Sequence, residues 1–74
     1  MQNGKDFNDR LKDLLEDKDL TQSEFAKRIN VTESCVSNYI QGTRLPGFEI
    51  IKRMAKELNV SPQFLLGIDN DQKY

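Results

Sequence analysis

The sequence predicts an all-α domain, a compact bundle of five short helices. Apolar residues recur at spacings of three and four along most of the chain, and no segment shows the alternation typical of a strand. Residues that favour helix starts and ends separate the apolar stretches. A chain of 74 residues allows one small domain, and short helices suit so small a core better than a sandwich or a barrel.

The first two predicted helices span about 6–17 and 22–29. Thr21 and Glu24 have the spacing of a capping box, in which each side chain binds a backbone N–H at the helix start. Asn30 follows the second helix where the chain must turn sharply, and asparagine tolerates a left-handed conformation. We expect the apolar faces of the two helices to carry Phe7, Leu11, Leu14 and Leu15, and then Phe25, Ala26 and Ile29.

The third predicted helix spans about 33–41, with Thr32 as its N-cap and Gly42 in the left-handed position after its end. The fourth spans about 48–58 and is closed by Asn59. We expect the inner faces to be formed by Val36, Tyr39 and Ile40 in the third helix and by Phe48, Ile51, Met54, Ala55 and Leu58 in the fourth.

Ser61 and Pro62 suit the N-cap and the first position of a short fifth helix, which Gly67 is expected to end. We therefore predict a domain over residues 1–67 and a polar tail over 68–74. Four apolar residues near this end either close the core or form a dimer interface: Phe64, Leu65, Leu66 and Ile68.

The composition excludes several classes of protein. No apolar run approaches the roughly 20 residues that cross a membrane, and the first ten residues lack the apolar stretch of a signal peptide. Cys35 is the single cysteine and there is no histidine, so neither an intrachain disulfide nor a Cys/His zinc site is expected. With no catalytic set, no metal and no cofactor expected, we predict a cytoplasmic protein that is not an enzyme.

The charge distribution is uneven. The net charge is −1 and the pI is about 5.3, which taken alone argues mildly against nucleic-acid binding. Residues 1–19 hold six acids and four bases, whereas residues 20–60 hold four acids and six bases. The central segment therefore remains compatible with a polyanionic partner.

The segment 21–41 carries the functional signal. Its two helices meet across a three-residue turn, with the small Ala26 at the crossing, Val31 in the turn and Val36 as the anchor of the second helix. Amides and hydroxyls are groups that hydrogen-bond base edges in the major groove, although an ordinary solvated helix face is also polar. The outer face of the second helix carries Glu33, Ser34, Ser37, Asn38 and Gln41.

The stretches LTQSEFAKRINVT, VSNYIQGTRLP and MAKELNVSPQFLLG resemble the phage-repressor/Cro-type helix-turn-helix family, also called the xenobiotic-response-element family, over residues 7–67. The resemblance implies a lambda-repressor-like fold whose third helix enters the major groove of double-stranded DNA. It also implies a homodimeric transcriptional regulator, a repressor, that reads a pseudo-palindromic operator with half-sites about 10 bp apart. An antitoxin-like or other protein-interaction module of the same fold is the alternative.

The resemblance also assigns roles to individual residues. It implies base reading by Glu33, Ser34 and Asn38. It implies contacts with phosphates or the groove edge from Gln22, Thr32, Ser37, Gln41, Thr43 and Arg44. Many relatives carry an arginine late in the first helix paired with a glutamate late in the third, and both positions are apolar here. We predict that these two apolar residues, Leu15 and Ile40, touch.

Other residues have competing interpretations. Cys35 is either a packed or idle thiol or a redox sensor beside DNA. Tyr39 is expected in the core because of its spacing. The cluster of Lys52, Arg53 and Lys56 is either a solvated face or a second DNA contact. The third helix has no Arg or Lys, so we expect modest affinity that depends on a partner subunit.

Overall fold

The computed structural model describes residues 6–68, and these form five helices and no strand. The helices are α1 (Phe7–Asp17), α2 (Gln22–Ile29), α3 (Glu33–Gln41), α4 (Phe48–Leu58) and α5 (Pro62–Leu65). The bounds predicted for α2, α3 and α4 are confirmed, and α1 begins one residue later than predicted. The predicted tail, 68–74, lies outside the described residues except for Ile68.

The local signals act as the sequence predicts. The Thr21 N–H donates to Glu24 Oε1 at 2.9 Å and the Glu24 N–H donates to Thr21 Oγ1 at 3.0 Å, which completes the capping box. The hydroxyl oxygen of Thr32 accepts from the Cys35 N–H, and that of Ser61 accepts from the Phe64 N–H. The left-handed positions after α2, α3 and α4 are taken by Asn30, Gly42 and Asn59.

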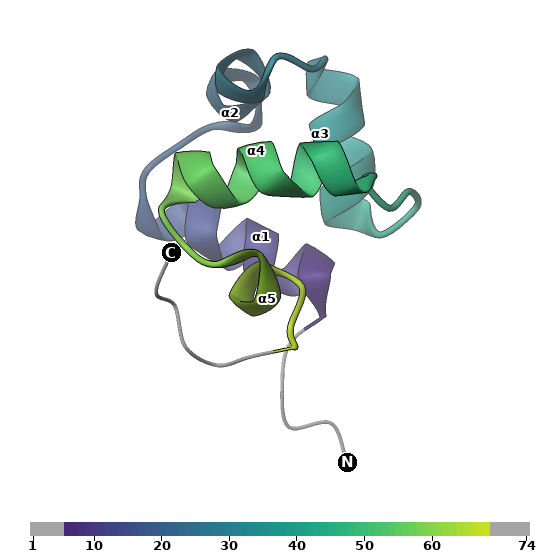
Figure 1. Cartoon of the computed structure of the whole chain (residues 1–74). Helices are drawn as coiled ribbons and strands as arrows, with labels where there is room; N and C mark the ends of the chain where they lie inside the picture. The colour runs from purple at the N-terminus through teal and green to yellow at the C-terminus, as the bar shows by residue number, and fades with distance from the viewer. Residues whose placement is uncertain (1–5, 69–74) are drawn as a thin grey trace.

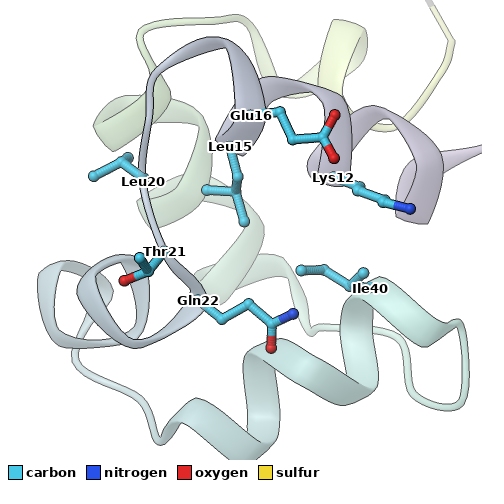
Figure 2. A pocket seen from close by; sticks show the side chains of 7 residues that line it. All are labelled: Lys12, Leu15, Glu16, Leu20, Thr21, Gln22 and Ile40. Carbon is cyan, nitrogen blue, oxygen red and sulfur yellow. The ribbon is translucent and has the colours of Figure 1, made fainter.

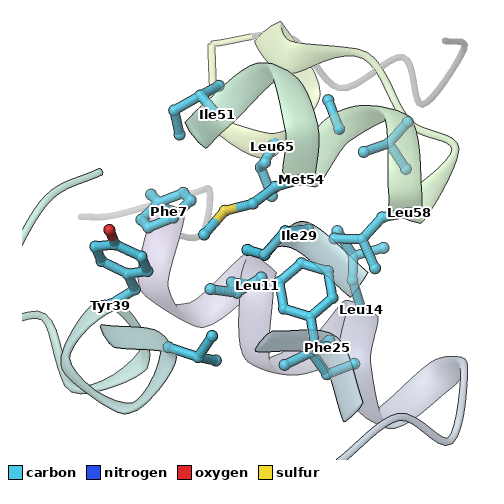
Figure 3. Packing of buried hydrophobic residues seen from close by; sticks show 14 of the residues in the cluster. Phe7, Leu11, Leu14, Phe25, Ile29, Tyr39, Ile51, Met54, Leu58 and Leu65 are labelled. Carbon is cyan, nitrogen blue, oxygen red and sulfur yellow. The ribbon is translucent and has the colours of Figure 1, made fainter. Parts of the chain in front are cut away.

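Figure 1 shows α4 crossing the molecule, with α2 above it, α3 passing behind its N-terminal end and α5 below it. The core lies where the five helices converge, and Figure 3 shows Phe7, Leu11, Met54 and Leu65 meeting in its centre. Full burial of one such side chain stabilises the fold by about 1.5–3 kcal/mol. The predicted inner faces of the first three helices are buried except for Ile40, which is partly buried at the edge of the core.

The prediction that Phe48 faces inward is wrong, because 74% of it is exposed. At 3.6 residues per turn, Phe48 lies about 70° from the centre of the stripe formed by the buried residues of α4. It is also the first residue of the helix, so its side chain extends past the end of the core. The rest of the predicted stripe is buried: Ile51, Met54, Ala55 and Leu58.

Three polar contacts fix α4 and α1 against their neighbours. Arg53 Nη1 donates to the carbonyl of Ile29 at 3.2 Å and so places a positive charge on the C-terminal end of α2. Arg28 pairs with Glu57 at 3.0 Å, an exposed contact of small energetic value. The guanidinium of the buried Arg10 lies 4.5 Å from the ring centroid of Phe64, which joins α1 to α5.

Candidate nucleic-acid interface

The α2–α3 pair is a rigid unit because its crossing is tightly packed. Ala26 and Val36 are almost fully buried there, and Val31 packs against the core from the turn. Asn30 has φ 64° and reverses the chain, which lets the Val31 N–H donate to the carbonyl of Ala26 at 3.0 Å. The packing therefore fixes how α3 is presented, as the sequence predicted.

The polar residues of α3 lie on the side opposite its buried Val36 and Tyr39. Glu33, Ser34 and Gln41 are exposed, while Ser37 and Asn38 are half-buried. The burial of Tyr39 confirms its place in the core. The outward face thus offers one carboxylate, two hydroxyls and two carboxamides, a set that can exchange hydrogen bonds with base edges.

Two hydrogen-bonded pairs of residues already organise this face. Gln41 Nε2 donates to Ser37 Oγ at 3.0 Å. Thr43, just beyond the helix, has its hydroxyl 3.2 Å from Asn38 Oδ1 and 3.3 Å from the Asn38 carbonyl oxygen, and it donates to both. We predicted separate roles for these four side chains from the sequence. They form pairs only in the folded chain.

The N-terminal end of α2 lies beside α3, because Gln22 and Ile40 line the same pocket (Figure 2). Its capping box uses the N–H groups of Thr21 and Glu24, and helix geometry leaves those of Gln22 and Ser23 without partners inside the helix. Such N–H groups attract an anion. The hydrogen bond from the Thr21 N–H lowers the pKa of Glu24, so a carboxylate also sits at this helix end and limits its positive potential.

Leu15 and Ile40 line a common pocket of about 240 Å³ together with Gln22. Figure 2 shows the two apolar side chains, one from α1 and one from α3, pointing toward the same hollow. Both side chains are uncharged, so neither leaves an uncompensated charge here. Their direct contact stays a prediction.

Arg44 is exposed in the loop between α3 and α4, directly after Thr43. It is the only Lys or Arg between Arg28 and Lys52. The loop therefore supplies the single cation next to α3 in the sequence. Cys35 is half-buried among the packed residues at the core edge.

The basic cluster on α4 divides into different environments. Arg53 is bound to the end of α2, as described above, and Lys52 lies 5.2 Å from the ring centroid of Phe48. Lys56 is exposed. At least one member of the cluster therefore has a structural contact, which the sequence did not indicate.

A family model described as helix-turn-helix matches residues 11–65. The chain belongs to this helix-turn-helix family. Within it, the resemblance to the phage-repressor/Cro type is confirmed. The family comprises DNA-binding transcription regulators and not enzymes.

One relative is the HTH-type transcriptional regulator ImmR of Bacillus subtilis (strain 168), which is 33% identical over 64 residues. The match covers 86% of this chain and 50% of that protein. The chain therefore spans about half the length of this relative.

Solved structures share the fold. The P22 c2 repressor in complex with a synthetic operator superimposes with a TM-score of 0.83 at 22% identity, over 88% of this chain and 98% of that chain. The DNA-binding domain of the same repressor in solution gives a TM-score of 0.84 at 22% identity, covering 99% and 96%. The restriction-modification controller protein C.AhdI from Aeromonas hydrophila gives 0.76 at 29% identity, covering 80% and 89%. The predicted lambda-repressor-like fold is confirmed.

Within residues 6–68 no helix is both long and apolar enough to span a membrane. Large apolar side chains remain exposed at two places on the surface. The first place is formed by Leu45, in the loop before α4, and Phe48, the first residue of α4. The second is formed by Leu66 and Ile68, at the end of α5 and just after it. Of the residues predicted to close the core or form a dimer interface, Leu65 is fully buried and Phe64 is half-buried under Arg10.

Proposed function

We propose that this chain is a sequence-specific, double-stranded DNA-binding transcriptional regulator, a repressor, with α3 in the major groove. The observation that carries the proposal is the rigid α2–α3 pair, which presents a face of amides, hydroxyls and one carboxylate. The anion-attracting end of α2 lies beside α3, and the exposed Arg44 follows α3 in the chain. Membership of the helix-turn-helix family supports the same function.

The residues divide into two groups. Base reading is assigned to Glu33, Ser34 and Asn38, which lie on the outward side of α3. Thr32 caps α3 with a lone pair of its hydroxyl, so its hydroxyl proton stays available for a phosphate. Contacts with phosphates or the groove edge are assigned to Gln22, Thr32, Ser37, Gln41, Thr43 and Arg44.

We further propose a homodimer, formed at least on DNA, that reads a pseudo-palindromic operator. Leu45, which directly follows Arg44 in the chain, and Phe48, the first residue of α4, are exposed. Two exposed side chains supply much less than the roughly 800 Å² per partner of a standard interface. A subunit contact built on these two side chains would be weak in solution and would be assembled by two adjacent half-sites.

Selection of binding sites from random duplexes at low salt tests this function. We expect an enriched palindromic sequence with half-sites about 10 bp apart. A matched control is the Asn38→Ala variant, which keeps the charge and is expected to enrich a less defined sequence. If the wild-type chain enriches no sequence at low salt, the proposed function is wrong.

A protein-interaction module of the same fold, similar to an antitoxin, is the second candidate. It is favoured by the net charge of −1 and by the exposed carboxylate of Glu33 on the presented face, both of which oppose a polyanion. The same selection separates the two candidates, because this second function predicts no enriched duplex.

A further inference from the structure

We propose that Thr43 is a positioning residue that sets which hydrogen-bonding group Asn38 presents to DNA. This inference rests on the proposed function, because it concerns the chemistry of base reading by α3. Of the two roles assigned to Thr43 above, it keeps the place at the groove edge and excludes a phosphate contact by the hydroxyl proton. It also gives the kind of base edge that Asn38 recognises.

The backbone places Thr43 over Asn38. Gly42 has φ 81° and reverses the chain after α3, with its N–H donating to the carbonyl of Tyr39 at 3.3 Å. The Thr43 N–H then donates to the carbonyl of Asn38 at 3.0 Å. Because two backbone hydrogen bonds hold this reversal, the hydroxyl of Thr43 is held close to the last turn of α3.

The hydroxyl proton of Thr43 is used at this position. It is shared between Asn38 Oδ1 at 3.2 Å and the Asn38 carbonyl oxygen at 3.3 Å. A threonine hydroxyl has one proton to donate, so the same proton is not available to a phosphate oxygen. The role of Thr43 is therefore tied to Asn38.

The bond fixes the carboxamide of Asn38. An unrestrained asparagine can turn its amide over and so exchange the positions of its acceptor and its donor. With Oδ1 held by Thr43, the carboxamide keeps one orientation, with both Nδ2 protons and one lone pair of Oδ1 left for DNA. Asn38 then has more donor than acceptor capacity, and it fits base edges that carry an acceptor, such as N7 of adenine, O6 and N7 of guanine or O4 of thymine.

A second side-chain hydrogen bond lies on the same face, and in this one the carboxamide is the donor and not the acceptor. Gln41 Nε2 donates to Ser37 Oγ, so the carbonyl of Gln41 and the proton of Ser37 remain for other partners. This pair joins two side chains of one exposed helix face, whereas Thr43 is held by the backbone. The hydrogen bond from Thr43 to Asn38 is the more constrained of the two, and our proposal rests on it.

The test compares Thr43→Val, which keeps the shape and removes the hydroxyl, with Thr43→Ser, which keeps the hydroxyl. Affinities are measured for the selected operator and for each single base-pair change, and Asn38→Ala identifies the pair that Asn38 reads. We expect Thr43→Val to reduce discrimination at that pair by about 2- to 12-fold, the value of one ordinary hydrogen bond. Thr43→Ser should retain the discrimination of the wild type. In the Asn38→Ala background, Thr43→Val should cause no further loss of discrimination at that pair.

Three results would overturn the inference. The first is that Thr43→Val loses affinity equally for all sequences and changes the salt dependence, and the second is that it leaves discrimination unchanged. The third is that Asn38 selects cytosine, whose major-groove edge offers a donor. The free protein gives an independent readout. The side-chain amide of Asn38 should change its NMR signals in Thr43→Val and not in Thr43→Ser. If the wild-type chain discriminates between sequences and Thr43→Val discriminates equally, the proposed function stands and only the role of Thr43 fails.

Discussion

Gly42 links the stability of the fold to the placement of the loop that we propose contacts DNA. It has φ 81°, a conformation that costs an L-residue about 1–2 kcal/mol. A Cβ added there would lie 3.3 Å from Nδ2 of Asn8, the far end of a flexible side chain that can move aside at little cost. The dihedral angle therefore dominates, and we predict that Gly42→Ala lowers the free energy of unfolding by about 1–2 kcal/mol.

The matched control is Gly42→Asn. Asparagine adds the same Cβ but tolerates the left-handed region, as Asn30 and Asn59 do in this chain. We expect Gly42→Asn to lose less than half as much stability as Gly42→Ala. For a domain of this size, 1 kcal/mol corresponds to a shift in Tm of about 4–8 °C.

Urea unfolding gives the comparison at constant temperature, with equal m-values showing that the denatured states are alike. Equal losses for the two variants would mean that crowding by Cβ, and not the dihedral angle, sets the cost. No loss for Gly42→Ala would refute the reversal of the chain after α3, and with it the placement of Thr43 and Arg44.

Four further predictions concern binding, pH and assembly. Arg44→Ala should weaken binding to all duplexes and reduce the slope of log K against log salt by about 1, and an unchanged slope would remove Arg44 from the phosphate contacts. Asn38→Ala should cost about 1–3 kcal/mol and relax preference at one base pair, as measured by competition with operator variants; an equal loss at every pair would exclude base reading. Because the folded state lowers the pKa of Glu24, its contribution to stability is present above about pH 4.3 and is lost as the pH falls through the lower folded value. The stability difference between the wild type and Glu24→Gln should therefore shrink on acidification, and a constant difference in urea unfolding from pH 3 to pH 7 would contradict this. Phe48→Ser should leave the affinity for a single half-site unchanged and reduce the cooperativity of binding to the full operator. Unchanged cooperativity would place the subunit contact elsewhere, and Leu66→Ser is the comparison variant.

Much of the fold could be predicted because its signals are local. A cap or a left-handed residue acts within a few positions of its own place in the chain, and Thr21, Asn30, Thr32 and Gly42 all act where the sequence placed them. The bounds of α2, α3 and α4 followed from these signals. The outward face of α3 could be predicted for the same reason, since helical spacing fixes which residues share a side.

The remaining features depend on how the helices dock. Arg10 is buried because α5 brings the ring of Phe64 against it, a contact over more than 50 positions of sequence. Arg53 binds the end of α2 because α4 crosses there. Phe48 follows the three-and-four spacing of α4 but lies off the centre of the buried stripe, at the first residue of the helix. No local pattern distinguishes these outcomes.

The low positive charge of the chain has a direct consequence for the proposed function. α3 carries no Lys or Arg, and Glu33 at its start repels phosphates. Nonspecific affinity depends on cations that neutralise phosphates, so it should be weak. Discrimination by amides and hydroxyls is affected less, and a second subunit would supply the missing affinity.

An NMR titration of the labelled chain with its selected duplex tests the central claim most directly. We predict the largest amide shifts along α3, at Gln22 and at Thr43–Arg44, with small shifts over the exposed face of α4 around Lys56. Shifts gathered on α4, or no sequence-dependent shifts on α3, would contradict it.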